Sequence, residues 1–351
     1  MGSFFKYLKT RKLLYACTLL LFFMMGCSNY YEGPMSEHYD GNTFYDPQNN
    51  TRKSFFSFLR WKFTSKKGSW PKELLPNKGV TPLKERVEGD DLIVTYIGHA
   101  TFLIQTQGLN ILTDPIFSDR ASPVTFAGPK RAHPPSHAIN TLPPIDVILL
   151  SHNHYDHLDL KSLEAIWEKY NPRIITPLGN DSIIEAHNAS IIVETYDWGQ
   201  SVDLSPEVEV FIEPMQHWSA RTFWDRNKAL WAAFTLKTSG GNLYVAGDSG
   251  YGNYFKESFE KHGSYRFAIL PIGAYHPRWF MQAAHMTPEE ALIAFQDLGL
   301  PYTAASHFDI FQLGDEPYGE ALKRLEEAKS FPKAKRFKAL EVGQQWNVPL
   351  I

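Results

Sequence analysis

A cluster of histidine and aspartate residues directly after an apolar segment constrains this chain more than any other feature. The apolar residues 145–150 lead into the stretch 152–157, which has the pattern H-x-H-x-D-H. The end of a strand is a rigid platform, and imidazole and carboxylate groups are the nitrogen and oxygen ligands that suit zinc. A solvated histidine-rich loop is the alternative, but this spacing after a buried strand favours a metal site. The candidate ligands are His152, His154, Asp156 and His157.

Three more candidate ligands stand at the ends of later apolar segments. Taken singly, a histidine or aspartate in such a place is more often a cap or a satisfied polar group. Their recurrence in the same context as the first motif favours one shared metal site. They are His217 after residues 208–214, Asp248 after residues 243–247, and His307 after residues 302–306.

Composition indicates a folded chain with a substantial core. The 351 residues are 43% hydrophobic and 14% aromatic, which is enough for one large or two ordinary domains. Lysine and arginine number 35 against 38 acidic residues, so nucleic acid is not an expected partner. The only cysteines are Cys17 and Cys27, both ahead of all the candidate ligands. The chain after Cys27 therefore contains no cysteine nucleophile and no cysteine-ligated zinc.

From residue 91 the chain alternates predicted strands and helices. Antiparallel-looking strands come first, strand–helix alternation follows, and a similar order then occurs again, which favours a layered α/β domain. Thr287, Pro288 and Glu290 supply an N-cap, a proline at the first helical position and a capping-box glutamate. Strands are expected at 92–97, 102–106, 109–113, 145–150, 173–176, 208–213, 231–237, 242–247 and 267–271, and helices at 159–170, 253–262, 288–298 and 317–328.

The order of the seven candidate ligands resembles the binuclear signature of the metallo-β-lactamase-fold hydrolases. The resemblance covers residues 90–345 and implies an αββα sandwich, a single catalytic domain over residues 91–351, with the metals at one edge of the paired sheets. It implies two Zn²⁺ ions, one of them replaceable by another divalent metal. His152, His154 and His217 would bind the first ion, Asp156, His157 and His307 the second, and Asp248 would bridge them.

Several longer motifs resemble the branch that contains N-acyl-phosphatidylethanolamine-hydrolysing phospholipase D. This resemblance implies attack on a phosphodiester by a metal-bridging hydroxide, with phosphatidic acid and an N-acyl-ethanolamine as products. His276 departs from the branch, where an acidic residue is expected, and headgroup preference could differ there. The motifs are YIGHAT (96–101), LTDPIFS (112–118), SHNHYDHLD (151–159), GDSGY (247–251), PIGAY (271–275), PRWFM (277–281) and MTPEE (286–290).

Further residues are candidates for supporting or substrate-binding roles. Asp114, at the end of segment 109–113, could orient a metal-bound histidine, and a turn before Pro115 is the alternative. With Asp114, the expected catalytic carboxylates are Asp156 and Asp248. Candidate substrate-side residues, for which structural roles are the alternative, are His99, His276, Arg278 and His285.

Residues 1–26 resemble the signal peptide of a bacterial lipoprotein. A basic start precedes the apolar run 13–25, which is short for a bilayer span, and the run ends in MMGC. The resemblance implies cleavage before Cys27, lipidation of Cys27 and a membrane-anchored place in the bacterial cell envelope, with Ser28 pointing toward the outer membrane. An uncleaved anchor is the alternative.

Residues 27–90 are interpreted as an extension ahead of the catalytic domain. Residues 28–50 are polar and predict a tether. Residues 52–70 interleave aromatic and basic side chains, which suits a membrane headgroup layer; the alternative is a helix packed on the domain.

The sequence thus predicts a membrane-tethered binuclear zinc hydrolase, a phosphodiesterase of the phospholipase D type with a phospholipid substrate. One alternative is the same fold hydrolysing a lactone or a soluble phosphodiester. Another is a lipoprotein that binds metal or lipid without turnover. The oligomeric state is left open.

Overall fold

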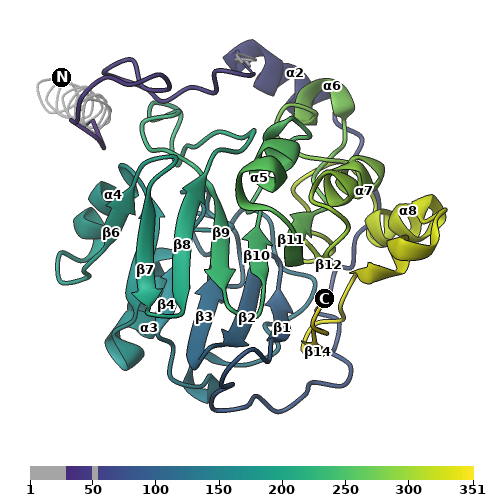
Figure 1. Ribbon diagram of the computed structural model, residues 1–351. Coiled ribbons are helices and arrows are strands. Elements are labelled where there is room, and N and C mark those ends of the chain that lie inside the picture. The colour runs from purple at the N-terminus through teal and green to yellow at the C-terminus, as the bar shows by residue number, and fades with distance from the viewer. Residues whose placement is uncertain (1–28, 50–53) are drawn as a thin grey trace, which may run out of the picture.

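The structure is a computed structural model that describes residues 29–49 and 54–351 (Figure 1). The predicted signal peptide, residues 1–26, and the predicted lipidation site, Cys27, lie outside the described residues. Among the residues that are described, none of the helices combines the length and the apolar character needed to cross a bilayer.

Two sheets of seven strands each, counted over the described residues, form the centre of the molecule (Figure 1). The first contains, in spatial order, β14 (Gln345–Asn347), β1 (Ile93–Gly98), β2 (Thr101–Thr106), β3 (Leu109–Thr113), β4 (Val147–Leu149), β5 (Arg173–Pro177) and β6 (Glu194–Tyr196). The second contains β13 (Phe337–Lys338), β12 (Tyr302–Ser306), β11 (Tyr265–Pro271), β10 (Asn242–Val245), β9 (Ala233–Thr238), β8 (Val208–Glu213) and β7 (Ser201–Ser205).

The two sheets follow the same order of pairing, as the sequence predicts. In the first, β1 to β3 pair antiparallel and β3 to β6 pair parallel. In the second, β7 to β10 pair antiparallel and β10 to β13 pair parallel. Because β8 and β10 are both antiparallel to β9, they run in the same direction as β12. The segments after β8, β10 and β12 therefore begin at the same edge of the second sheet.

Helices cover the outer face of each sheet, which completes the predicted αββα sandwich. The first sheet packs against α3 (Leu160–Tyr170) and α4 (Asn180–His187). The second packs against α5 (Tyr254–His262), α7 (Pro288–Asp297) and α8 (Glu320–Ala328). The other α-helices of residues 29–49 and 54–351 are α2 (Phe55–Thr64) and the single turn α6 (Arg278–Met281). Of these helices, α4 and α6 are absent from the sequence prediction, as are the strands β6, β7, β13 and β14.

The predicted start of α7 is confirmed in detail. Thr287 Oγ1 accepts a hydrogen bond from the Glu290 backbone N–H at 3.2 Å, and the Glu290 carboxylate accepts one from the Thr287 N–H at 2.9 Å. This capping box satisfies two N–H groups that a helix start would otherwise leave without partners. It also fixes the direction in which the chain enters α7.

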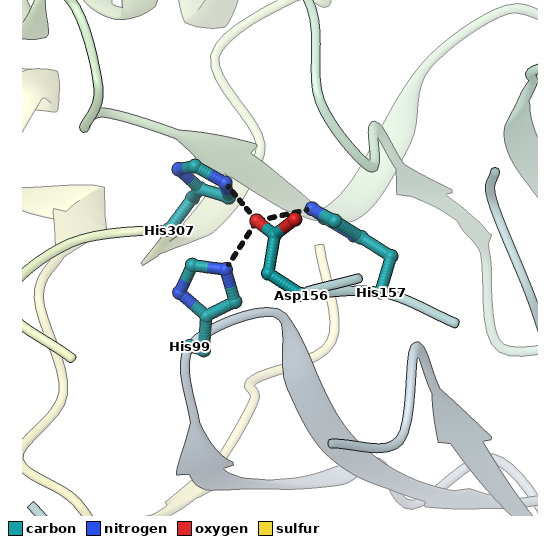
Figure 2. Close-up of side chains that lie close together, drawn as sticks. All are labelled: His99, Asp156, His157 and His307. Carbon is teal, nitrogen blue, oxygen red and sulfur yellow. Dashed lines mark hydrogen bonds and ion pairs between the residues drawn. The ribbon is translucent and has the colours of Figure 1, made fainter. Parts of the chain in front are cut away.

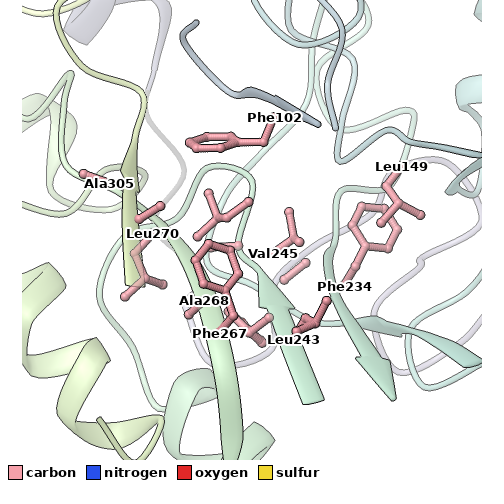
Figure 3. Close-up of a cluster of buried hydrophobic side chains, with 14 of the residues drawn as sticks. Phe102, Leu149, Phe234, Leu243, Val245, Phe267, Ala268, Leu270 and Ala305 are labelled. Carbon is pink, nitrogen blue, oxygen red and sulfur yellow. The ribbon is translucent and has the colours of Figure 1, made fainter. Parts of the chain in front are cut away.

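The main hydrophobic core lies between the two sheets (Figure 3). Phe102 and Leu149 enter it from the first sheet, and Phe234, Val245 and Phe267 enter it from the second. A second core, between the first sheet and its helices, is built mainly from leucine and isoleucine. Since close-packed interiors deform little, these cores hold the strand ends in fixed positions.

The interpretation of residues 28–50 as a tether is wrong for the part that the structure describes. Tyr39 and Phe44 are fully buried in the main core. The Phe44 N–H also donates to the Asn227 carbonyl at 2.7 Å. The reason is physical: two large aromatic side chains in an otherwise polar segment gain more by burial than the segment loses by becoming ordered.

The aromatic-basic stretch contains α2, and this helix packs on the domain. Trp61 stacks on Phe280 of α6, with 4.9 Å between ring centroids. Trp61 Nε1 and Ser65 Oγ donate to Asp315 Oδ1 at 3.2 and 2.5 Å. The packed-helix alternative for residues 52–70 therefore holds for residues 54–70.

Candidate metal centre

The seven predicted ligands gather at one edge of the sandwich, in groups that share members. Within each group the candidate ligand atoms all lie within 4.8 Å of one another. The loop after β4 supplies four of the seven residues, and the segments after β8, β10 and β12 supply one each. The groups are His152, His154 and His217; His99, Asp156, His157 and His307; His152, His157 and Asp248; and Asp248, His285 and His307.

The first group, the three-histidine cluster, consists of His152, His154 and His217. His154 Nδ1 lies 2.8 Å from His152 Nε2 and 3.2 Å from His217 Nε2. Burial lowers the pKa of both His154 and His217 to about 3, so both rings are neutral and have a free lone pair at neutral pH. The other nitrogen of His217, Nδ1, donates to the Ala284 carbonyl at 3.0 Å and fixes the orientation of the ring.

The second group, the Asp156 cluster, surrounds one carboxylate oxygen (Figure 2). Asp156 Oδ2 lies 2.9 Å from His99 Nε2, 3.0 Å from His307 Nε2 and 3.3 Å from His157 Nε2. Burial alone would raise the pKa of Asp156, but the His157 charge and the hydrogen bonds from the histidines hold it well below its usual value. Figure 2 shows all three imidazole rings turned toward this carboxylate.

Asp248 lies between the two clusters. Its Oδ2 is 2.9 Å from His307 Nε2 and 3.2 Å from His157 Nε2, both in the Asp156 cluster. The same oxygen is 4.0 Å from His217 Nε2 in the three-histidine cluster. A carboxylate in this place can reach ions held by either group, which fits the bridging position expected for it.

Asp114 orients two of the histidines. Its carboxylate accepts hydrogen bonds from the Ser151 N–H at 2.7 Å, from Ser151 Oγ at 2.6 Å and from His157 Nδ1 at 2.8 Å. Ser151 Oγ in turn lies 2.9 Å from His152 Nδ1. Asp114 is buried and has a φ of 34°, a conformation unusual outside glycine. Because it fixes the far nitrogen of His157, it leaves Nε2 facing the site.

The charge on His157 depends on the surrounding carboxylates. Burial alone would lower its pKa, but Asp248, Asp156 and Asp114 together raise that pKa well above the ordinary value.

The sequence analysis did not predict that Ser151 would join Asp114 and His152 in a hydrogen-bond network. Its position directly before His152, at the end of the strand segment, is the signal that could have identified it.

The side chains present fit a divalent metal ion. His154 Nε2 and Asp248 Oδ1 are buried and have no hydrogen-bond partner among the described residues. Buried polar atoms in folded proteins normally have partners, so these two require an explanation. The neutral imidazoles of His154 and His217 and the ionised carboxylates of Asp156 and Asp248 are nitrogen and oxygen donors of the kind that zinc and related ions prefer.

The four candidate substrate residues divide into two pairs. His99 belongs to the Asp156 cluster, and His285 Nδ1 lies 3.8 Å from Asp248 Oδ2. His276 lies instead against Glu320, at 3.5 Å. Arg278 donates to both oxygens of Glu290 at 2.7 Å and to the His285 carbonyl at 2.9 Å.

The structure therefore brings His99 and His285 to the metal centre but does not group His276 or Arg278 with it. The guanidinium of Arg278 is neutralised by a carboxylate of α7, so its contacts support the segment that carries His285. A spacing pattern cannot predict this pairing, because the partner carboxylate is chosen by how α6 packs beside α7.

The sequence of residues 109–308 matches the family model described as "Beta-lactamase superfamily domain". All seven predicted ligands lie within this range. The chain belongs to the Beta-lactamase superfamily. The family match and the His/Asp clusters agree with a metal-binding site at this edge of the metallo-hydrolase fold.

Relatives in this superfamily include a phospholipase. The chain is 33% identical to "N-acyl-phosphatidylethanolamine-hydrolyzing phospholipase D 1" of Caenorhabditis elegans, over 73% of this chain and 75% of that protein. It is 36% identical to an uncharacterized protein of Mycobacterium tuberculosis over 68% of this chain. That match spans 64% of the length of the mycobacterial protein.

Solved structures share the fold at low sequence identity. An isothiocyanate hydrolase from Delia radicum gut bacteria has a TM-score of 0.59 and 18% identity, covering 72% of this chain and 98% of that chain. A possible metal-dependent hydrolase from Veillonella parvula has a TM-score of 0.60 and 13% identity, covering 73% and 99%. These neighbours confirm the metallo-β-lactamase fold.

Proposed function

We propose that the protein is a binuclear zinc phosphodiesterase of the phospholipase D type, acting on N-acyl-phosphatidylethanolamine-like lipids. The observation that carries the proposal is Asp248, which lies within 4.0 Å of histidines from both clusters. The identity of 33% to a nematode phospholipase D with that substrate in its name supports the lipid class.

In this proposal each cluster holds one ion. His152, His154 and His217 would hold the first, Asp156, His157 and His307 would hold the second, and Asp248 would be shared between them. Two such ions, when bound, supply Lewis acidity that activates a water and stabilises negative charge on the phosphoryl oxygens.

The residues of the chain contribute orientation and hydrogen bonds. Asp114 keeps His157 and, through Ser151, His152 in fixed rotamers, so their metal-facing nitrogens need no rearrangement before binding. His285 lies beside Asp248, where it can donate a hydrogen bond to a phosphoryl oxygen of the substrate, and the role proposed for it is to position the phosphodiester. His99 donates its Nε2 hydrogen to Asp156, so the role proposed for it is to position that carboxylate.

The proposed reaction is an in-line hydrolysis of the phosphodiester. The oxygen of water forms a bond to phosphorus while the bond from phosphorus to the ethanolamine oxygen breaks, and a proton passes to the departing alcohol. The products are phosphatidic acid and an N-acyl-ethanolamine. Lipidation at Cys27, in the bacterial cell envelope, would hold the enzyme at its substrate.

Product analysis by mass spectrometry tests this function. The metal-loaded full chain is incubated with N-acyl-phosphatidylethanolamine in detergent micelles, beside Asp248→Asn and His157→Ala. His187→Ala is the matched control, because His187 lies on α4 and pairs with Glu164 at 3.0 Å, outside the clusters. We expect both products with the unmodified chain and the control, and at least about a hundredfold less with either site variant.

Metal analysis of the same samples separates the possible failures. An unmodified chain that holds two metal ions per molecule but forms neither product would refute the lipid substrate. A chain that binds no transition metal would refute the binuclear centre itself. Circular dichroism of the variants checks that they are folded, and Asp248→Asn conserves shape if His157→Ala unfolds.

A further inference from the structure

Aromatic side chains from three separate segments are exposed on one side of the metal centre. These segments are α2, α6 and the loop 218–226, and together they are named the aromatic face. Soluble proteins rarely expose several large aromatic side chains together unless the surface binds something. The most exposed members are Phe56 (79%), Phe63 (83%), Phe223 (71%), Trp224 (62%) and Trp279 (45%).

The aromatic face is held together by ring contacts. Trp61 of α2 stacks on Phe280 of α6, with 4.9 Å between centroids. Phe58 of α2 packs edge-on against Phe223 of the loop at 6.1 Å. Phe58, Trp61 and Phe280 are half-buried by these contacts, whereas Phe223 remains 71% exposed although it touches Phe58. The ring contacts thus connect the three segments that carry the exposed rings.

The part of the aromatic face around α2 is basic, and the acidic side chain of the loop 218–226, Asp225, is buried. Residues 54–72 carry five basic side chains and no acidic one, although acidic residues outnumber basic ones in the whole chain. Arg60 lies over the Trp279 ring at 4.7 Å, which places a cation directly among the exposed aromatics. Rings interleaved with cations suit the headgroup layer of an anionic membrane, where amphipathic aromatics and lysines both find partners.

The aromatic face borders the candidate metal centre at two points. The loop 218–226 begins directly after His217, and the ring centroids of Trp218 and His154 are 4.3 Å apart. At the second point, Arg278 of α6 donates to the carbonyl of His285. In Figure 1, α2 and α6 lie at the end of the molecule toward which β8 and β10 point, which is the end that carries the ligands.

We infer that the aromatic face docks on the surface of an anionic lipid bilayer. The exposed phenylalanine and tryptophan rings enter the headgroup layer, the basic side chains of residues 54–72 contact lipid phosphates, and the edge of the metal centre at His217 and His285 faces the membrane. The catalytic meaning of this docking rests on the proposed function, since a lipid phosphodiester would then reach the site without crossing bulk water.

Site-specific fluorescent labels test this orientation in the full chain. Cys17 and Cys27 are replaced by serine, and a single new thiol is labelled with an environment-sensitive dye in Phe63→Cys, Trp224→Cys or Ile192→Cys. Ile192 is the matched control, because it is 75% exposed but lies between α4 and β6. Vesicles of phosphatidylcholine mixed with phosphatidylglycerol should shift the emission of the first two labels to the blue and leave the third unchanged.

A label at Ile192 that responds as strongly as the other two, or three labels that all fail to respond, would overturn the inference. A response at Phe63 and Trp224 that grows with protein concentration in the absence of vesicles would also overturn it, because it would identify a second copy of the chain as the occupant.

The contribution of the basic side chains to membrane binding is tested separately. Lys66→Gln combined with Lys67→Gln should weaken binding to these vesicles by about fivefold for each cation removed. Lys256→Gln combined with Lys323→Gln, on α5 and α8, is the matched control and should bind unchanged. Equal affinity of the two double variants, or equal binding to pure phosphatidylcholine, would refute the choice of an anionic surface.

Failure of this inference and failure of the proposed function give different results. The labels report docking without any turnover, while hydrolysis is measured on substrate in detergent micelles. If the chain hydrolyses the lipid but the labels do not respond, the docking inference is refuted and the proposed function stands. If the chain docks but yields no product, the docking inference stands and the proposed substrate is refuted.

Discussion

Replacing Asp114 by asparagine tests whether the metal centre depends on a residue that does not bind the metal in the proposed arrangement. The Asp114 carboxylate accepts three hydrogen bonds, from Ser151 N, Ser151 Oγ and His157 Nδ1, at 2.6–2.8 Å. Asparagine has nearly the same shape but only one accepting oxygen and no charge. It can therefore no longer satisfy both the backbone of Ser151 and the ring of His157.

The size of the effect follows from the bond that is lost. A hydrogen bond to a charged group contributes about 1.5–3 kcal/mol, and loss of a partner that orients a ligand costs about 10–100-fold in metal affinity. These two ranges agree, because about 1.4 kcal/mol corresponds to a tenfold change. We expect Asp114→Asn to weaken zinc binding by about 10–100-fold, and hydrolysis at limiting zinc to fall in proportion.

The assay is competition for zinc with a chromogenic chelator, followed by hydrolysis at limiting and at saturating zinc. Asp159→Asn is the matched control, because the Asp159 carboxylate accepts from the Ser118 N–H at 3.0 Å and from Ser162 Oγ, and Asp159 belongs to none of the ligand groups of the described residues. Excess zinc should rescue most of the activity of Asp114→Asn if its role is orientation. Zinc affinity equal to that of the control, in a variant that is folded, would refute the reasoning.

Three further outcomes are expected. Burial raises the pKa of the Glu316 carboxyl above its ordinary 4.5, so the native state binds this proton more tightly than the unfolded state does, and the resulting stabilisation is lost as the pH rises through the raised pKa. Glu316→Gln should therefore reduce the fall in Tm between acidic and neutral buffer. A dependence of Tm on pH equal to that of the exposed-site variant Glu327→Gln would contradict this. Phe267 is fully buried between the sheets, so Phe267→Ala should lower the free energy of unfolding by about 3–5 kcal/mol in urea titrations, and a loss below about 1 kcal/mol would show that the core is not packed as described. Removing metal from the loaded protein with EDTA should lower its Tm, since an ion that binds only the native state stabilises it; a smaller change in His154→Ala would confirm the site, and an identical Tm with and without EDTA would contradict it.

The sequence by itself determined much of the local chemistry. Apolar segments that end in His152, Asp248 and His307 predicted that these residues lie at strand ends, and they do. Thr287 and Glu290 predicted the start of α7, and the capping box is present. Such features depend on residues a few positions apart, so spacing and side-chain type are sufficient to identify them.

Other features were decided only by the tertiary structure. Asp248 comes between the two clusters because β8, β10 and β12 run in the same direction, and strand direction is a property of the whole sheet. Arg278 pairs with Glu290 because α6 lies beside the start of α7. The side chain of Tyr39, which stands in a polar segment of the sequence, is fully buried in the main core.

The aromatic face illustrates the same division. The sequence showed that residues 52–70 are rich in aromatic and basic side chains, and it left both a membrane contact and a packed helix open. The structure shows that the helix packs through Trp61 and still exposes Phe63, and that Phe223 and Trp279 arrive beside it from distant parts of the chain. Periodicity along a segment records which side chains lie on its faces. Only the packing of all segments decides which of those faces meet each other and which meet the surroundings.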